Sequence, residues 1–169
     1  MTVHIGPLEP GHASEALTVQ LAAYADVARQ YGAPDLPPMV ETVEALRADL
    51  ESGIPAFGAW LGPRLAGSVR GRPDGARMEV SRLSVAPDLH GRGIGRRLLA
   101  TVEAAAPPAV RVLWLVTGVS SDTSLALYGR AGYAVVGESV DAAGVALVVL
   151  EKGVASRPSR LGGRWGRAG

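Results

Sequence analysis

The sequence predicts a single α/β domain of the α+β type, in which helices flank a mixed, mostly antiparallel and twisted sheet. Three observations support this prediction. The 169 residues match the usual size of one domain, and 47% of them are hydrophobic, which is enough to build a core. Segments with apolar residues at helical spacing alternate with short β-rich segments. Glycine- and proline-containing turns join neighbouring β segments, as in antiparallel hairpins.

The first half of the chain is expected to contain a strand, two helices and a hairpin. Apolar side chains at helical spacing predict the two helices, and the proline-rich stretch 32–38 is predicted to be a rigid link between them. Gly62-Pro63 marks the hairpin turn. The expected elements are a strand at residues 3–6, helices at 12–31 and 40–52, and strands near 54–61 and 64–72.

The second half is expected to alternate strands and helices and to close with a hairpin. Residues 110–117 are continuously apolar, which predicts a strand buried on both faces. Ser120 to Thr123 form a polar cluster suited to capping the next helix. The expected elements are strands at 78–85 and 110–117, helices at about 94–106 and from 122, and paired strands near 133–141 and 145–152.

Composition limits the classes of site that the chain is expected to hold. The chain has no cysteine, which excludes disulfides and thiolate metal sites, and its three histidines lack the spacing of zinc ligands. No apolar run approaches the length needed to cross a membrane, and the first residues do not resemble a signal peptide. We therefore expect a cytoplasmic protein with neither a metal nor a membrane contact.

One segment, residues 80–99, has the pattern of a strand, a glycine-rich loop and a helix. Pro87 ends the strand because it removes a backbone donor. Glycines then occur at alternate positions, and a ligand can approach the main chain closely where no Cβ intervenes. The following helix would direct its unpaired N–H groups and positive dipole end at an anion. The glycines are Gly91, Gly93 and Gly95, accompanied by Arg92, Arg96 and Arg97.

Two common phosphate-binding motifs do not fit this loop. Counted from Gly91, the last glycine of a dinucleotide-binding G-x-G-x-x-G motif would fall on Arg96. A P-loop has a lysine directly after a glycine, but the only lysine of the chain is Lys152.

The segment resembles instead the acyl-coenzyme A loop of the GNAT superfamily of N-acetyltransferases. The family pattern is Arg or Gln, two residues, Gly, one residue, then Gly or Ala, after a strand that ends in valine. These places are occupied here by His90, Gly93 and Gly95. His90 departs from the pattern, and it is interpreted either as a solvated turn residue or, when protonated, as a phosphate contact.

A second segment supports the same resemblance. The stretch Tyr128-Gly129-Arg130-Ala131-Gly132-Tyr133 is similar to the Tyr-x-x-x-Gly-Phe pattern of the family. The family often has an asparagine seven residues before that tyrosine, where this chain has Ser121.

The resemblance implies an acetyl-CoA-dependent N-acetyltransferase that transfers an acetyl group directly to a primary amine of a small molecule. Two alternatives stay open, namely an acetyltransferase for protein or peptide amines and a non-catalytic sensor domain that binds acyl-CoA. Acetyl-CoA is the implied co-substrate, and its pyrophosphate would be held mainly by backbone N–H groups. The implied cofactor-binding residues are Leu83, Ser84, Val85, His90, Gly91, Arg92, Gly93, Ile94, Gly95, Arg96, Ser121, Ser124 and Tyr128.

The reaction requires proton transfer, because an alkylamine with a pKa of about 10 is protonated at neutral pH. The resemblance implies that Glu79 acts as a general base through water, and strand alternation predicts that it shares a face with Ser81, Leu83 and Val85. Alternatively, Glu79 is an exposed charge or forms a salt bridge with Arg77 or Arg82.

A thiolate leaves when the thioester is cleaved, and it must be protonated. The resemblance implies Tyr128 as the general acid, although an aromatic side chain packed in the core is the alternative. The oxyanion would be stabilised by a backbone N–H at the end of the strand, for which Val85 is the candidate.

Charge is unevenly distributed along the chain. Residues 1–60 contain eight acidic residues and two arginines, whereas residues 61–152 contain eleven basic and eight acidic residues. A basic cofactor segment beside an acidic acceptor segment would suit a polyanionic cofactor and a cationic amine, although simple drift of surface charge explains the same pattern. Asp35, Glu41 and Glu44 are the candidates for binding a polyamine.

The expected partners are a coenzyme A thioester and an amine acceptor, with no nucleic acid, and a homodimer is left open. The domain is expected to span residues 1–152. Residues 153–169 contain four arginines among Gly, Ser and Pro and are expected to form a flexible Arg/Gly-rich tail.

Overall fold

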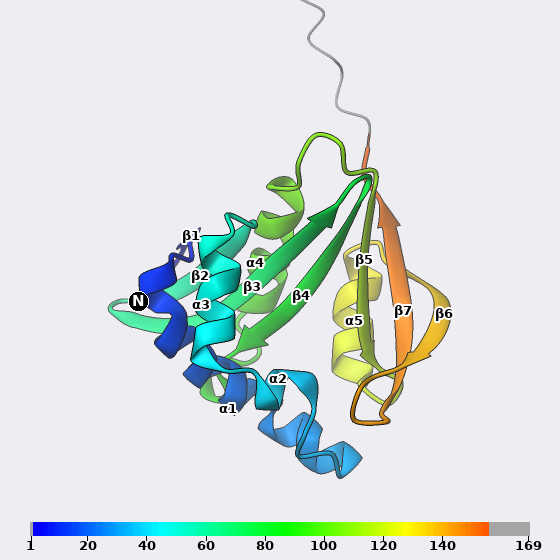
Figure 1. Ribbon diagram of the computed structural model, residues 1–169, viewed down its shortest axis with the longest axis horizontal. Coiled ribbons are helices and arrows are strands. Elements are labelled where there is room, and N and C mark those ends of the chain that lie inside the picture. Colours follow the sequence, from blue (N-terminus) through cyan, green and yellow to red (C-terminus); the bar gives the residue numbers. More distant parts are fainter. Residues whose placement is uncertain (1, 156–169) are drawn as a thin grey trace, which may run out of the picture.

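A computed structural model describes residues 2–155, and it confirms the predicted single α/β domain with a mostly antiparallel sheet. Seven strands form one sheet in the order β1-β2-β3-β4-β5-β7-β6 (Figure 1). All neighbouring strands are antiparallel except β4 and β5, which are parallel. The strands are β1 (Val3–Pro7), β2 (Ala56–Leu61), β3 (Arg64–Asp74), β4 (Arg77–Val85), β5 (Val112–Gly118), β6 (Ala134–Val140) and β7 (Ala146–Gly153).

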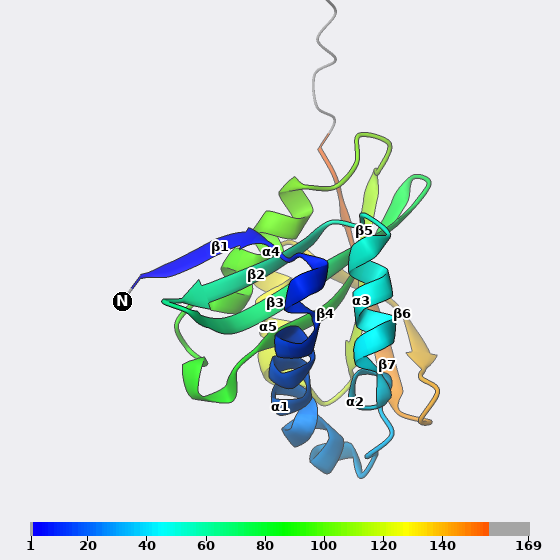
Figure 2. The ribbon, with the colours of Figure 1, turned by 60° about the vertical axis from the view of Figure 1, so that its left-hand side comes forward.

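Helices cover both faces of the sheet (Figure 2). Helices α1 (Ala13–Tyr31), α2 (Pro37–Val40) and α3 (Val43–Glu51) lie over one face, and α4 (Ile94–Ala104) and α5 (Asp122–Arg130) lie behind the other. Two short 3₁₀ helices, at Pro10–His12 and Pro87–Leu89, precede α1 and the glycine-rich loop. Within residues 2–155, no helix has the length and apolar character required to cross a bilayer.

The predicted link and second helix are corrected in detail. Part of the link is helical, because Pro37 and Pro38 occupy the first turn of α2, where a missing N–H does no harm. Helix α3 begins at Val43 and not at residue 40, because Thr42 is its N-cap and accepts a hydrogen bond from the Ala45 N–H at 3.1 Å.

Close packing joins α4 to the centre of the sheet. Leu98, Leu99 and Val102 of α4 are almost completely buried. A Cβ at Gly67 of β3 would lie 2.6 Å from the Ser84 carbonyl oxygen and 3.1 Å from Leu98 Cδ1. The absence of a side chain at this position therefore allows the helix that begins at the glycine-rich loop to pack directly on the sheet.

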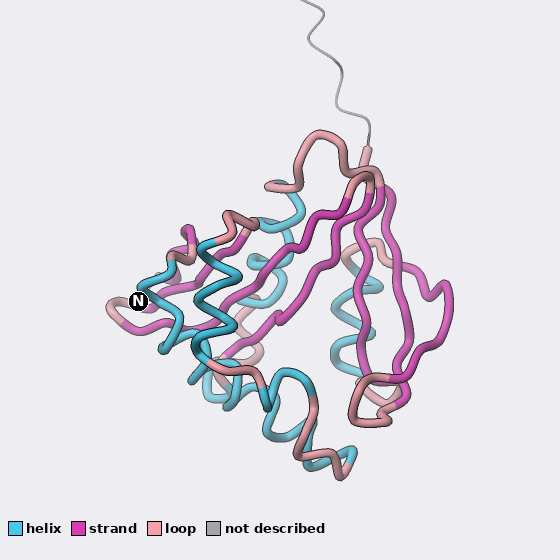
Figure 3. Tube along the Cα trace, in the orientation of Figure 1, coloured by secondary structure: helices cyan, strands magenta, loops and turns pink. Residues whose placement is uncertain are grey.

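The two parallel strands β4 and β5 pair over a short stretch and then separate (Figure 3). Residues 77–79 pair with residues 112–114, and no pairing between the two strands follows in the described chain. The backbone groups of the second half of β4 that point toward β5 are therefore free of a neighbouring strand.

A β-bulge in β4 overturns the predicted face of Glu79. Ser84 pairs with Ser68, but Ser81 pairs with Arg70, so two residues of β4 lie opposite one residue of β3. Arg82, at the bulge, has φ 55° and is the only non-glycine residue with positive φ between residues 2 and 155. The alternation of side chains therefore shifts by one position at this point.

The neighbours of β4 confirm the shift. The Met78 sulfur lies near Gly71 and Val102 on the α4 side, and Val85 lies near Gly95 of α4 on the same side. Met78 and Val85 are seven residues apart and would face opposite sides of a regular strand. Glu79 therefore faces α1 to α3, whereas Val85 faces α4, and the predicted common face was wrong.

Strand β5 is buried on one face only, which corrects the prediction of burial on both. Leu113 and Leu115 are buried, but Trp114 is partly exposed and Val116 on the same side is 36% exposed. The helices α1 to α3 lie over β2 to β4 and leave this side of β5 uncovered (Figure 1). The predicted tail lies outside the described residues from residue 156 onward, and β7 itself extends to Gly153.

Candidate active site

The glycine-rich loop has the backbone geometry of an anion site. Gly91 and Gly93 both have φ 75°, and Gly93 is the N-cap of α4. In the described chain, the six backbone N–H groups from Gly91 to Arg96 have no hydrogen-bond acceptor. The side chains of Arg92 and Arg96 are exposed and form no hydrogen bond within residues 2–155, whereas Arg97 donates to the Val3 carbonyl at 3.1 Å. Free N–H groups at a helix start suit a phosphorylated ligand.

His90 has a role that neither sequence interpretation anticipated. Its Nε2 lies 3.0 Å from the carbonyl oxygen of Val85. This contact links the start of the loop to the end of β4, five positions earlier in the chain.

The end of β4 directs backbone groups toward β5. The Ala86 N–H donates to the Ala66 carbonyl of β3 at 2.8 Å, so the N–H of Val85 points the other way, into the space where β5 has moved off. The Leu83 carbonyl oxygen points in the same direction and accepts a hydrogen bond from the Tyr24 hydroxyl at 3.4 Å. Ser84, also predicted as a cofactor residue, is buried, and its hydroxyl donates to the Arg82 carbonyl at 3.1 Å.

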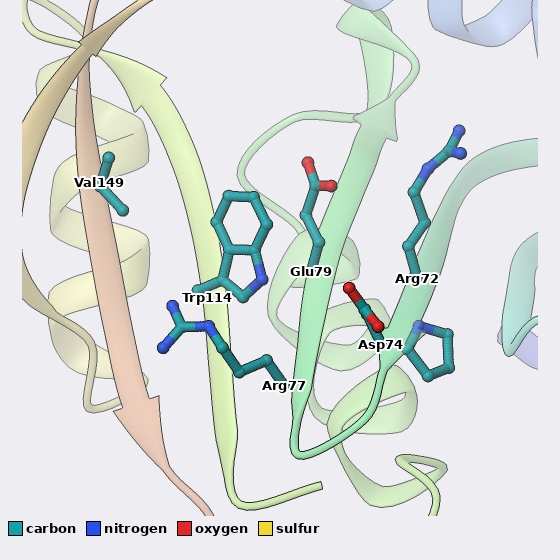
Figure 4. Close-up of a pocket in the computed structure, with 7 residues that line it drawn as sticks. Arg72, Asp74, Arg77, Glu79, Trp114 and Val149 are labelled. Carbon is teal, nitrogen blue, oxygen red and sulfur yellow. The ribbon is translucent and has the colours of Figure 1, made fainter.

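Glu79 lines a cleft of ≈ 440 Å³ on the face of the sheet over which α1 to α3 lie (Figure 4). It pairs in register with Trp114 of β5, where β4 and β5 begin to separate. The cleft is lined by Arg72, Pro73, Asp74, Arg77, Glu79, Trp114 and Val149. Burial raises the pKa of Glu79, while the positive charges of Arg72 and Arg82 oppose that rise.

The salt bridge considered for Glu79 does not form. Arg77 pairs instead with Glu151, and Arg82 lies 3.5 Å from the Glu41 carboxylate. Within residues 2–155, Glu79 has no ion-pair partner. A partly desolvated carboxylate without a fixed partner is available to accept a proton.

Tyr128 belongs to α5 and is buried in the main hydrophobic core. Its ring packs edge-to-face on Tyr133 at a centroid distance of 5.9 Å. Its hydroxyl has no hydrogen-bond partner in the described chain, and burial raises its pKa above the ordinary value, with a smaller contribution from Tyr24. The hydroxyl therefore stays protonated at neutral pH and is free to donate.

The start of α5 contains the other two predicted residues. Ser121 is the N-cap of α5, within the polar cluster predicted to cap this helix, but its side chain makes no capping hydrogen bond. Its predicted contact with the cofactor stays a prediction. The turn is held instead by Tyr31, whose hydroxyl accepts from the Ser120 N–H at 2.9 Å. Ser124 is half-buried in the first turn of α5.

Helix α5 meets the loop and β4 at one point. A Cβ at Gly95 would lie 3.7 Å from Leu127 of α5 and 3.7 Å from Val85 of β4. The predicted loop, strand and helix residues therefore gather around the C-terminal end of β4.

A buried ionic network lies on the face of the sheet that carries Glu79, and the sequence analysis did not predict it. Arg70 is 2% exposed and donates to Glu41 at 2.7 and 2.9 Å, to Asp49 at 2.6 Å and to Gln20 at 3.0 Å. Asp49 also accepts from Arg72. Burial alone would raise the pKa of Glu41, but hydrogen bonds from Arg70 and Gln20 lower it to about 2.

This network corrects the assignment of acceptor-binding acids. Both Glu41 oxygens accept hydrogen bonds from buried donors, so this carboxylate is not accessible to a polyamine. Asp35 and Glu44 remain exposed, and their predicted role is untested. Two features of the sequence pointed to the network: Gln20 interrupts the apolar side of α1, and Arg70 and Arg72 share one face of β3.

Comparison with known proteins identifies a match to the family model described as Acetyltransferase (GNAT) family, over residues 21–133. No match was found among curated proteins. Among solved structures, the PaiA N-acetyltransferase from Thermoplasma acidophilum in complex with coenzyme A superposes with a TM-score of 0.74 and 19% identity, covering 91% of this chain and 100% of that chain.

Two further structures are similar. The ribosomal-protein-S18-alanine N-acetyltransferase from Escherichia coli has a TM-score of 0.73 and 16% identity, covering 95% of this chain and 99% of its own. The protein yncA from Salmonella typhimurium, solved with its cofactor acetyl-CoA, has a TM-score of 0.73 and 16% identity, covering 94% and 98%. At these identities, the likeness establishes the fold.

Proposed function

This chain belongs to the GNAT acetyltransferase family, and from that premise we propose that it transfers an acetyl group from acetyl-CoA directly to a primary amine of a small molecule. The observation that carries the proposal is the junction at the end of β4. There, the free N–H groups of the loop and the Tyr128 phenol lie where β4 has parted from β5. The Glu79 carboxylate lies six residues earlier on β4, where the two strands begin to separate.

Acetyl-CoA would bind along the loop. Its pyrophosphate suits the N–H groups from Gly91 to Arg96, and Arg92 and Arg96 add positive charge beside them. Two solved structures of the same fold were obtained with coenzyme A or acetyl-CoA, which supports this co-substrate. The open space around Gly91 and Gly93, where an added Cβ would meet no atom within 4 Å, leaves room for the ligand.

Glu79 would remove the proton from the acceptor. An ammonium group is not a nucleophile, so the site must accept a proton before the nitrogen attacks the thioester carbonyl carbon. Because burial raises the pKa of Glu79, the carboxylate is a stronger base than an exposed glutamate. Glu79 and Val85 face opposite sides of the bulged strand. An amine that attacks a thioester beside Val85 would therefore pass its proton to Glu79 through water.

Val85 and Tyr128 would stabilise the negative charge that develops on the carbonyl oxygen and on the sulfur of the thioester. The Val85 N–H points into the space beside β5 and would donate to the oxyanion that forms on the thioester carbonyl. When the carbon–sulfur bond breaks, the Tyr128 hydroxyl would donate to the sulfur of the departing thiolate. No residue of this chain needs to carry the acetyl group.

The test is release of coenzyme A from acetyl-CoA by the purified chain, across polyamines, aminoglycosides, amino acids and peptides. We expect turnover with small amines, and thermal stabilisation by acetyl-CoA alone. Turnover confined to peptides would instead indicate a protein acetyltransferase. Stabilisation with no turnover on any amine would indicate a domain that only binds acyl-CoA.

A further inference from the structure

We propose that Arg82 is a carboxylate-binding residue beside Glu79, and that the acceptor is therefore a small amine that also carries a carboxylate, as an α-amino acid does. The inference rests on the proposed function, because it assumes that the amine is delivered to Glu79. It is carried by the hydrogen bonding of Arg82, by its position on the bulge and by the charges around it.

The guanidinium of Arg82 has donors that the protein does not use. Its Nε is fully shielded from solvent and has no hydrogen-bond partner within residues 2–155. No hydrogen bond from its other nitrogens is formed in that part of the chain either. Unlike Nε, the two terminal nitrogens are not shielded from solvent, and a ligand carboxylate would accept from both of them.

Glu41, the nearest carboxylate, does not satisfy Arg82. Its Oε2 lies 3.5 Å from Arg82 Nε, which is too long for a strong hydrogen bond. The same oxygen already accepts from Gln20 at 2.7 Å and from Arg70 at 2.7 Å. Glu41 therefore stabilises the charge of Arg82 without using its donors.

The bulge brings Arg82 to the face of Glu79. They are three positions apart in the sequence, so a regular strand would place them on opposite faces. The bulge at Arg82 shifts the alternation, and the side chain lies beside Glu41 on the α1-to-α3 side. A positive φ at a residue with a side chain is uncommon, and bulges of this kind re-aim side chains next to active sites.

The charges on this face favour an anion. Three guanidinium groups, those of Arg70, Arg72 and Arg82, are close to two carboxylates, those of Glu41 and Asp49. Arg82 shares Glu41 with Arg70, so this group of five has one more positive than negative charge. Glu79 and Asp74, which line the cleft, are the other carboxylates of this face. Once Glu79 takes the proton of the ammonium, the guanidinium of Arg82 has only the Glu41 carboxylate that it shares with Arg70, and the carboxylate of an amino acid would balance its charge.

The cleft provides room for the rest of such a molecule. Figure 4 shows the Glu79 carboxylate directed along β4 away from Arg77, which is the direction of Arg82 in the chain. Trp114 and Val149 form an apolar wall of the cleft to one side of it. An amine between Glu79 and Arg82 could therefore place an apolar side chain on Trp114.

The experiment compares amino acids with their amides, for example L-alanine with L-alaninamide and L-phenylalanine with L-phenylalaninamide. Each pair differs only in the carboxylate. Binding to the full chain is measured by isothermal titration calorimetry in the presence of coenzyme A, and turnover by release of coenzyme A from acetyl-CoA. We expect the amino acids to bind about 10- to 100-fold more tightly than the amides, which is the range of a charge-assisted hydrogen bond.

Variants at one position assign the effect to Arg82. Arg82→Met should remove the preference for the acid and leave binding of the amide unchanged, and Arg82→Lys should restore part of the preference. Arg29→Met, which removes an exposed arginine on α1, should retain the full preference and serves as the control for lost positive charge.

The outcomes separate the two proposals. The carboxylate site would be overturned if the amino acid and its amide bind equally, or if neither binds. It would also be overturned if Arg82→Met lowers the affinity for both by the same factor. An amino acid that binds through Arg82 without being acetylated would support the site and count against the proposed reaction. Rapid turnover of the amides alone would support the reaction and overturn the site.

Discussion

The Nε2 of His90 lies 3.0 Å from the carbonyl oxygen of Val85, and this contact joins the glycine-rich loop to the end of β4. The loop is proposed to hold the pyrophosphate of acetyl-CoA, and Val85 to stabilise the oxyanion. A single side chain therefore links the segment proposed to hold the pyrophosphate to the strand end proposed to stabilise the oxyanion.

His90→Ala should raise the KM for acetyl-CoA about fivefold, because one hydrogen bond of about 1 kcal/mol is lost. His90→Gln keeps a donor and should retain most of the affinity. Steady-state kinetics with varied acetyl-CoA measures both. The same KM for all three proteins would show that the contact to Val85 does not position the loop.

Glu79→Gln should lower kcat/KM by about 100-fold or more, as expected for loss of a general base. In the unchanged chain, kcat/KM should fall as the pH drops through the raised pKa of Glu79, because the protonated carboxyl cannot accept a proton. Arg72→Met removes a charge that lowers this pKa, so the fall should begin at a higher pH. A pH–rate profile that is unchanged in both variants would exclude Glu79 as the base. Glu138→Gln, at an exposed strand residue, is the control.

Tyr128→Phe should lower kcat by about 100-fold and leave the melting temperature nearly unchanged, since the hydroxyl makes no hydrogen bond in the described chain. Tyr133→Phe is the matched control. It loses a 3.1 Å hydrogen bond to Glu103 and should lower stability by about 1 kcal/mol without affecting kcat. Full turnover by Tyr128→Phe would rule out the proposed acid.

Gly93→Ala should weaken the thermal stabilisation by acetyl-CoA. Gly93 has φ 75°, and a Cβ would project into the open space where the ligand approaches. Gly75→Ala is a matched control, because Gly75 has φ 58°, no atom within 4 Å of an added Cβ, and a place in the β3–β4 turn. Each substitution should lower stability by about 1–2 kcal/mol through left-handed strain. Only Gly93→Ala should also reduce the rise in melting temperature caused by acetyl-CoA. An equal rise in both variants would count against the loop as the binding site of acetyl-CoA.

Glu41→Gln should destabilise the fold by about 3 kcal/mol at neutral pH, because it leaves the charge of Arg70 short of a partner at a site where that side chain is 3% exposed. Glu41 has a folded pKa of about 2 against a usual value of 4.5. Its stabilising contribution is therefore complete above pH 4.5 and is lost as the pH falls toward 2. Urea unfolding between pH 4.5 and 2 should show a smaller loss of unfolding free energy for Glu41→Gln than for the unchanged chain. Equal losses would contradict a stabilising role of the ionised Glu41 carboxylate.

The loop and the order of elements were predictable because both depend on local patterns in the sequence. Gly91, Gly93 and Pro87 impose their backbone preferences whatever surrounds them, and the helical spacing in residues 13–31 follows from the period of the helix itself. The same locality explains two errors. Periodicity cannot reveal that the outer side of β5 lacks a covering helix, and a serine at an N-cap position does not ensure a capping bond at Ser121.

By itself, the sequence determined the fold class, the family and the loop residues, because each depends on contacts between residues that are near one another in the chain. Only the tertiary structure decided the face of Glu79, the burial of Glu41 and the unused donors of Arg82. These depend on a one-residue bulge and on ion pairs between residues 21 to 41 positions apart in the chain. A shift of one residue reverses every side chain that follows it, and no local pattern in the sequence records that shift.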